Sequence, residues 1–263
     1  MNWYDPLDDS NPVITPQAEI DGFLRKRRDV TDFGVSDRFL MLETGEDMSY
    51  LKTKYSIDEE SFPLPAFLGK RPIYTINGES KISAIEKAFG APVAVDVLET
   101  AIAMGCKRLF AFGLCGAISE RLNIGDLVIA TEIIREEGTS HHYAPNGLNA
   151  KPDQELMTRL INFMKNENQL NVYSGKTVST DAVFRQTLKK ELNWRVNGIL
   201  GVDMEMSALL TVAEYHQIPA VCLLVVSDKH DLGENAQWHW GGEVLERNRK
   251  IAIETFIEFV RNN

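Results

Sequence analysis

The chain has 263 residues and a mass of 29.6 kDa, which suits one large α/β domain that buries well over half of its unfolded surface. Hydrophobic residues make up 44% of the chain and charged residues 25%, an ordinary composition for a globular protein. The net charge of −10 argues against a nucleic-acid partner, and no apolar run approaches the roughly 18 residues of a membrane helix, so no membrane partner is expected.

The first segment in chain order is residues 1–20, whose aspartates and prolines predict an extended N-terminal arm. Such an arm is either mobile or packed on a neighbouring subunit. A β-rich region around residues 72–76 follows, and it ends at Asn77-Gly78, a dipeptide typical of turns.

From residue 91 onward, apolar periodicity predicts a regular alternation of helices and strands. A helical face between residues 93 and 102 ends at Gly105, where glycine suits a left-handed cap. Further strands are predicted at 109–112, 127–131, 172–178, 199–203 and 220–226, and helices at 153–165, 205–216 and about 245–259. This alternation implies right-handed crossovers. We therefore expect a single α/β domain over residues 1–263, with a central mixed, mostly parallel twisted sheet flanked by helices.

Residues 199–228 are the most informative stretch, because acidic residues follow both of their predicted strands. Asp203 and Glu205 flank Met204 after the first strand, and Asp228 follows the second. In an open parallel sheet, ligands bind at the carboxyl ends of the strands. We therefore expect these acids to border one ligand site.

Two motifs here, Val-Asp-Met-Glu at residues 202–205 and Ser-Asp at 227–228, resemble the signature of the nucleoside phosphorylase superfamily. This family contains purine and uridine phosphorylases and related nucleosidases. The likeness continues upstream in residues 112–117, which are similar to the family's phosphate and ribose loop, and in the strand at 124–129. It covers roughly residues 68–262. The resemblance implies a phosphorylase-like fold and a pentosyltransferase without a metal or organic cofactor, using inorganic phosphate as co-substrate.

The resemblance also implies roles for individual side chains. Glu205 would accept hydrogen bonds from two ribose hydroxyls, and Met204 would lie against the base. Asp228 would protonate N7 of a purine as the glycosidic bond stretches, a task that needs a raised pKa. Simpler interpretations are a helix-dipole acid, a gap-filling methionine and a helix N-cap. The full set implied for substrate binding is Gly113, Cys115, Gly116, Phe184, Val202, Asp203, Met204 and Glu205.

The phosphate site departs from the family pattern. Ala111 stands where well-studied phosphorylases carry an arginine, and Leu114 where they carry a serine or threonine. The backbone at Leu114, with Ser140 and His142 of the polar segment after the strand at 127–131, is therefore the expected phosphate site. Arg135 is another candidate cation. A solvated surface loop is the alternative interpretation of that polar segment.

A second cation is missing near the predicted acid. Gly241 falls close to the position where purine enzymes carry an arginine that assists the acid, and only Lys229 or His230 offers a substitute. Trp238 and Trp240 in the same region predict either a flap over the site or an oligomer contact.

The predicted activity is phosphorolysis of a purine nucleoside to free base and ribose 1-phosphate. Purines are favoured because Gln186 is not part of the Gln-x-Arg pair that reads the pyrimidine in uridine phosphorylases. The missing cations leave two alternatives open: a hydrolytic nucleosidase, and a relative that binds nucleosides without turnover. They also suggest that a neighbouring subunit completes the site, so a homodimer or hexamer is expected.

The cysteines and histidines carry no signal of their own for disulfides or metals. Cys106, Cys115 and Cys222 have no paired spacing and lie in or near apolar stretches, which favours reduced thiols and a cytoplasmic location. The five histidines include a His141-His142 doublet but no pair at helical spacing.

Overall fold

The computed structural model describes residues 10–27, 30, 33–167, 169–232 and 237–263. Within these ranges ten strands form one sheet in the order β10-β9-β6-β7-β8-β5-β1-β4-β3-β2. The strands are β1 (Arg38–Leu42), β2 (Ile57–Leu64), β3 (Arg71–Ile76), β4 (Ile82–Ile85), β5 (Arg108–Ala117), β6 (Leu127–Glu136), β7 (Val172–Thr180), β8 (Gly201–Asp203), β9 (Ala220–His230) and β10 (Trp238–Trp240).

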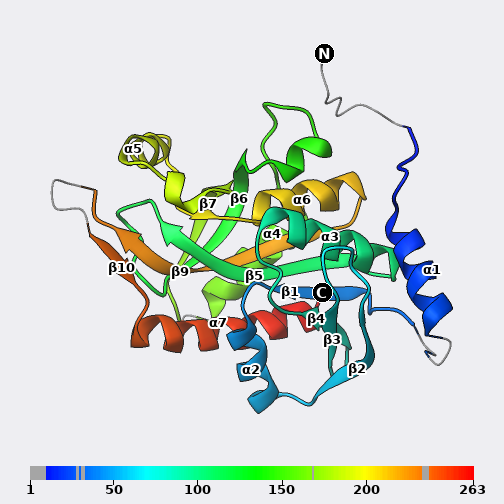
Figure 1. The fold of residues 1–263 in the computed structure, drawn as a ribbon. Helices are drawn as coiled ribbons and strands as arrows, with labels where there is room; N and C mark the ends of the chain where they lie inside the picture. Colours follow the sequence, from blue (N-terminus) through cyan, green and yellow to red (C-terminus); the bar gives the residue numbers. More distant parts are fainter. Residues whose placement is uncertain (1–9, 28–29, 31–32, 168, 233–236) are drawn as a thin grey trace.

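Helices cover the sheet on both sides (Figure 1). They are α1 (Pro16–Lys26), α2 (Gly45–Lys54), α3 (Ala91–Ala103), α4 (Gln154–Asn166), α5 (Leu188–Val196), α6 (Met206–Tyr215) and α7 (Glu243–Arg261), with short 3₁₀ helices η1 (Thr139–His142) and η2 (Val183–Arg185). In the described part of the chain, none of these helices combines the length and apolarity that a membrane crossing requires.

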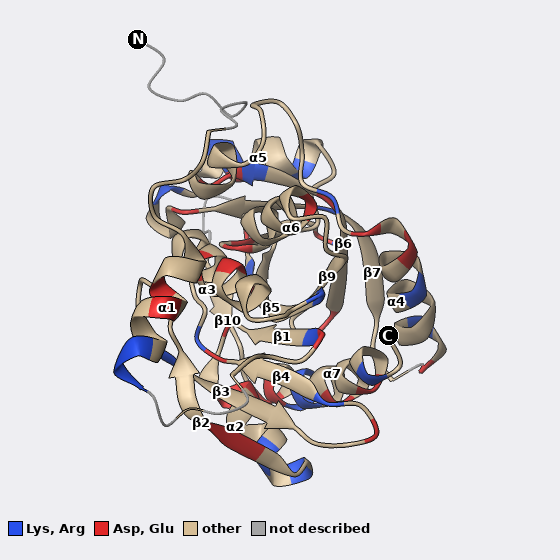
Figure 2. Cartoon of the chain, turned by 90° about the vertical axis from the view of Figure 1, so that its right-hand side faces the viewer, with Lys and Arg blue, Asp and Glu red and all other residues tan. Residues whose placement is uncertain are grey.

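The sheet is mixed, and part of it closes on itself. Strand β9 pairs with β6 on one side and with β5 on the other, while β8 joins β5 to β7. Strands β9, β6, β7, β8 and β5 therefore form a closed ring, which Figure 2 shows from the end. The two longest ladders, β5–β9 and β6–β7, are parallel. The α/β class with a mixed sheet is confirmed, but the site lies at the end of a closed barrel rather than along an open edge.

Alternate residues of β5 contribute to two separate cores. Leu109 and Ala111 pack with α3 and α6, whereas Phe110 and Phe112 pack with α7 and its neighbours. Because side chains alternate between the faces of a strand, a strand covered on both sides must be apolar at every position. This double burial explains the continuous apolar run at residues 109–112.

The predicted strands after residue 105 all exist, but β5, β6, β7 and β9 run further than expected. Strand β5 continues to Ala117 and β9 to His230, because the two strands stay paired up to Ala117 and Lys229. The segment Gly113–Gly116 is therefore part of a strand and not a loop that leads into a helix. Likewise Asp228 lies inside β9, which removes the helix N-cap interpretation.

The N-terminal arm is only partly as expected. Residues 1–9 lie outside the described residues. Residues 16–20 are the start of α1 and not an extended segment, because Pro16 occupies the first turn and the Thr15 side chain accepts the Ala18 N–H. Ile20 and Phe23 bury one face of this helix, so it belongs to the core.

Candidate functional site

A pocket of about 340 Å³ opens where β5, β8 and β9 come together, a volume suited to a small molecule. It is lined by Glu43, Phe89, Leu114, Cys115, Gly116, Val183, Phe184, Gln186, Glu191, Val202, Asp203, Met204, Glu205, Ser227, Asp228, His230, Trp238 and Trp240. Most of the residues predicted for substrate binding are in this set, and so is the predicted acid. Gly113, Ser140 and His142 are not among the described residues that line it.

The two glycines of β5 allow close approach of neighbouring side chains. Gly116 pairs with Val202 of β8 and with Asp228 of β9, and a Cβ at position 116 would lie 3.1 Å from the Asp228 carboxylate. At Gly113 an added Cβ would lie 2.0 Å from the Glu43 carboxyl group. Gly113 therefore makes room for Glu43, and its predicted contact with the ligand stays a prediction.

Glu205 lies at the start of α6 and is buried. Its carboxylate accepts the backbone N–H groups of Gly90 and Met204. Burial raises the pKa of Glu205 to about 7, since the loss of water disfavours the charged form more than these hydrogen bonds favour it. Glu205 can therefore change its charge near neutral pH.

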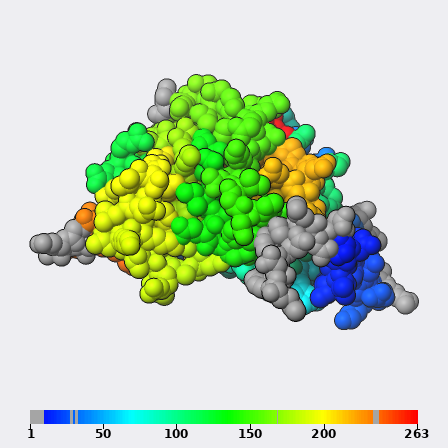
Figure 3. Space-filling view, turned by 90° about the horizontal axis from the view of Figure 1, so that it is seen from above, coloured from blue at the N-terminus to red at the C-terminus, as the bar shows by residue number. Residues whose placement is uncertain are grey.

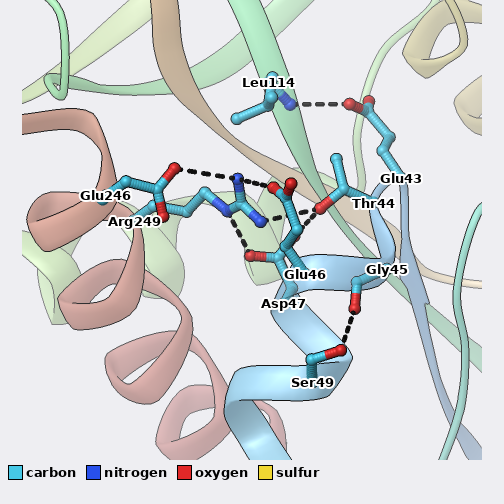
Figure 4. A network of polar contacts seen from close by, with 9 residues as sticks. All are labelled: Glu43, Thr44, Gly45, Glu46, Asp47, Ser49, Leu114, Glu246 and Arg249. Atoms are coloured by element: carbon cyan, nitrogen blue, oxygen red, sulfur yellow. Dashed lines mark hydrogen bonds and ion pairs between the residues drawn. The ribbon is translucent and has the colours of Figure 1, made fainter. Parts of the chain in front are cut away.

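Glu43 is a second buried acid, and the sequence reasoning missed it. It follows β1 directly, and its Oε2 accepts the Leu114 N–H at 2.7 Å (Figure 4). Glu205 lines the same pocket and interacts electrostatically with Glu43. Burial and the charge of Glu205 hold the pKa of Glu43 well above its usual value. The signal was present, because an acid directly after a buried strand is the pattern that identified Asp228.

Asp203 organises the turn between β8 and α6. Its Oδ1 accepts the N–H groups of Glu205 and Met206 at 3.0 and 2.8 Å and the Ser179 hydroxyl at 2.6 Å. Burial raises the pKa of Asp203 to about 6. These contacts fix the backbone that carries Glu205, so Asp203 holds the site in shape as well as lining it.

Asp228 accepts two hydrogen bonds and forms one ion pair inside the pocket. The hydrogen bonds come from the Ser227 hydroxyl at 2.5 Å and the Trp238 indole N–H at 2.8 Å, and the ion pair is with His230 Nε2 at 3.2 Å. Burial raises the pKa of Asp228, but the bonds from His230, Ser227 and Trp238 outweigh it, so the net pKa lies below its usual value. The expectation of a raised pKa is corrected, because the acid has gained donors that the sequence did not reveal.

His230 supplies the positive charge beside this carboxylate. Its Nδ1 lies 2.8 Å from Glu191 Oε1, opposite the contact with Asp228. These two carboxyl groups raise the pKa of His230 to about 9. At neutral pH the pocket therefore contains an Asp228 carboxylate and a His230 imidazolium.

The tryptophan segment forms β10, an edge strand antiparallel to β9. Its register places Trp240 opposite Asp228 and Trp238 opposite His230. The predicted flap thus covers the acid directly. On the other rim, Phe184 of η2 is 97% exposed and lines the pocket from there, free of packing against the core.

The residues predicted to hold phosphate are not brought together. Ser140 is buried in η1, where its hydroxyl accepts the Arg135 Nε–H at 2.8 Å and its N–H is donated to Glu137. Arg135 also donates to the carbonyl groups of residues 144, 145 and 148. Figure 3 shows this segment (green) beside α5 (yellow) on the outer face. The placement of Ser140 and His142 at the phosphate position is therefore corrected: they lie in η1, and Ser140 and Arg135 stabilise its loop.

Leu114, the remaining phosphate candidate, lines both the pocket and a second cavity of about 610 Å³ beside it. The second cavity contains Lys87 and Arg249. The Arg249 guanidinium donates to Asp47 at 2.6 Å, Glu46 at 2.8 Å and Thr44 at 3.0 Å (Figure 4). This cation is therefore neutralised by two acids in the first turn of α2. Among the described lining residues of the first pocket, no lysine or arginine occurs, and His230 is the cation.

The comparisons with known proteins agree with this geometry. A family model described as "Phosphorylase superfamily" matches residues 37–262. A guanosine phosphorylase of Halorubrum lacusprofundi is 28% identical over 173 residues, which cover 66% of this chain and 71% of the relative. The structure of a uridine phosphorylase from Vibrio fischeri superposes with a TM-score of 0.74 at 19% identity, covering 87% of this chain and 93% of that one. A purine nucleoside phosphorylase from Toxoplasma gondii also gives 0.74, at 16% identity and coverage of 87% and 92%. The two structures share the fold.

Proposed function

This chain belongs to the phosphorylase superfamily, a family of nucleoside phosphorylases, and we propose that it cleaves a purine nucleoside to free base and ribose 1-phosphate. The observation that carries the proposal is the position of two acids around one strand residue. Gly116 pairs with β8, which leads to Glu205, and with Asp228 of β9. A nucleoside in the pocket can therefore meet one acid at its ribose and the other at its base.

The two acids differ in environment, as their proposed tasks require. Glu205 is buried beside the Gly90 and Met204 amides and has carboxylate oxygens suited to ribose hydroxyls. Asp228 lies next to an imidazolium, which is a source of the proton that the leaving base needs. Met204 and Phe184 line the same pocket and together offer apolar surfaces for the flat base.

A purine is favoured over a pyrimidine by two features. Protonation at N7 is the way in which an acid such as Asp228 assists the departure of a purine. Gln186 lines the pocket, but no arginine accompanies it among the described lining residues. The names of the relatives include both a guanosine and a uridine phosphorylase, so the choice of base rests on these residues.

Hydrolysis is the second candidate, and Glu43 favours it. A phosphate beside Leu114 would meet the buried pair of Glu43 and Glu205 instead of a cation, and like charges at short range repel. Water carries no charge and can donate a proton to a carboxylate. The same acid and ribose contacts would serve either reaction.

The test is incubation of the pure protein with inosine, adenosine, guanosine and uridine, with and without phosphate. Chromatography would identify the free base and distinguish ribose 1-phosphate from ribose. We expect purine release that requires phosphate. Release that is indifferent to phosphate would identify a nucleosidase, and calorimetric binding without any product would identify a non-catalytic relative.

A further inference from the structure

His230 is held between two carboxyl groups that belong to different elements. Its Nε2 lies 3.2 Å from Asp228 Oδ2, and its Nδ1 lies 2.8 Å from Glu191 Oε1. Asp228 is on the same strand, β9, whereas Glu191 comes from α5. All three side chains line the pocket, so the chain of contacts runs from the helix to the site.

Both contacts are satisfied together only when the imidazole carries two protons. Each ring nitrogen faces an oxygen that accepts, and a neutral imidazole has one N–H to donate. Glu191 is buried, and its Oε2 has no hydrogen-bond partner in the described chain. A buried carboxylate with an oxygen left unpaired is costly unless a positive charge lies beside it. The geometry therefore keeps a proton on His230.

We propose that Glu191, His230 and Asp228 form a proton relay to the leaving base, an inference that rests on the proposed glycosidic cleavage. His230 stores the proton, Asp228 passes it on, and Glu191 is a positioning residue that orients the imidazole and keeps it charged. The relay replaces an isolated carboxylic acid, which the donors around Asp228 disfavour.

The proton moves along these contacts as the glycosidic bond breaks. When the bond between C1′ and N9 breaks, its electron pair moves onto the base. N7 takes a proton from the Asp228 carboxyl group, which takes one from His230 Nε2. His230 becomes neutral, keeps its Nδ1 proton towards Glu191 and regains the other from solvent, to which it is partly exposed. Phosphate or water completes the reaction at C1′.

The pKa of His230 depends on the charged groups that face its imidazole. Asp228 is the charged neighbour from β9, and Glu191 is the one from α5. Strand β10 contributes Trp238, which does not titrate, and Lys229 points elsewhere, to the carbonyl groups of residues 120 and 122. Removing the charge of Glu191 should therefore lower the pKa of His230. The Asp228 carboxylate remains and continues to raise that pKa.

The test compares Glu191→Gln with wild-type protein in the pH profile of kcat/KM. We expect the fall of activity at high pH to begin about one unit lower in the variant, a roughly fivefold loss at pH 9 relative to wild type that approaches tenfold at higher pH. A nitrophenyl riboside, whose leaving group needs no protonation, should show no such shift. Glu120→Gln is the matched control, because Glu120 contacts Arg195 of the same helix but does not line the pocket.

An independent readout is the pKa of His230 by NMR, with its signal assigned from His230→Asn. The pKa of His230 should fall in Glu191→Gln and remain at the wild-type value in Glu120→Gln. An active enzyme whose basic limb and His230 pKa are both unchanged in Glu191→Gln would overturn the relay. Wild-type protein that releases no base would instead contradict the proposed function. If Glu191→Gln does not fold, His230→Asn tests the relay, since it should slow nucleosides and spare the nitrophenyl riboside.

Discussion

The buried carboxyl groups of Glu43 and Glu205 line the same pocket and interact electrostatically, although 162 positions separate them in the numbering. Burial makes a charge on each of two neighbouring carboxyl groups costly, and the two charges also repel each other. Burial and this repulsion therefore hold the pKa of Glu43 well above its usual value. The protonation state of Glu43 and Glu205 therefore affects the stability of the fold. It also sets the charge that a phosphate or water acceptor would meet in the pocket.

The Glu43→Gln variant should gain stability relative to wild type as the pH rises. The folded-state pKa of Glu43 is raised, so its contribution is full below the unfolded-state value near 4.5 and is lost as the pH rises towards the folded-state value. Glutamine does not titrate, so the variant avoids this loss. Its free energy of unfolding should rise relative to wild type by up to about 1.4 kcal/mol per pH unit. Urea unfolding at pH 5, 6.5 and 8 measures the difference. A constant difference in the free energy of unfolding would contradict the raised pKa.

Asp228→Asn should separate proton donation from positioning. Loss of a general acid costs about 10²–10⁴-fold in rate on a purine nucleoside. The same variant should recover most of its activity on a nitrophenyl riboside, because that leaving group departs without a proton. Steady-state kinetics on both substrates provide the comparison. Equal losses would mean that Asp228 only positions the ligand.

Glu205→Gln should weaken recognition of the ribose. Hydrogen bonds to a charged group contribute about 1.5–3 kcal/mol, so kcat/KM should fall by roughly 10–100-fold. The fall should be smaller on a 2′-deoxynucleoside, which lacks one of the hydroxyls that the carboxylate would bind. A double-mutant-type cycle between the variant and the two sugars measures this dependence. Identical losses on both sugars would rule out a contact with the 2′-hydroxyl.

Ser140→Ala should reduce the stability of the fold without changing the binding of phosphate. The buried hydroxyl accepts the Arg135 Nε–H, and its removal leaves a buried donor unpaired at a cost of about 1–3 kcal/mol. Denaturant unfolding should detect the loss, while the KM for phosphate stays at the wild-type value. A large increase in that KM would restore Ser140 to the phosphate site.

The protein should form a homodimer or a hexamer in solution. The first pocket has no lysine or arginine among its described lining residues, so a phosphate cation has to come from elsewhere, and a neighbouring subunit is the expected source. Helix α5 and η2 also expose Val183, Phe184, Leu188, Leu192 and Val196 near the pocket. Light scattering measures the mass. A monomer near 29.6 kDa would refute this expectation.

Element types were predictable where their signals were local. The helix expected at 153–165 is α4, whose periodicity is visible in the sequence and whose cap is Asp153, accepting the Leu156 N–H at 2.8 Å. The turn at Asn77-Gly78 joins β3 to β4 as an antiparallel pair. Strand ends were less predictable. Strands β5 and β9 continue beyond their apolar runs because they remain hydrogen-bonded to each other there.

The sequence by itself determined the α/β class and the family, and it predicted roles for Glu205 and Asp228, since an acid directly after an apolar strand is a pattern of neighbouring residues. The tertiary structure decided which groups surround them. Glu43 reaches Glu205 from β1, and Glu191 reaches His230 from α5. It also decided the direction of the Asp228 pKa, because a pKa depends on burial and on charges and donors within a few ångströms, and those neighbours are set by strand register and not by distance along the chain.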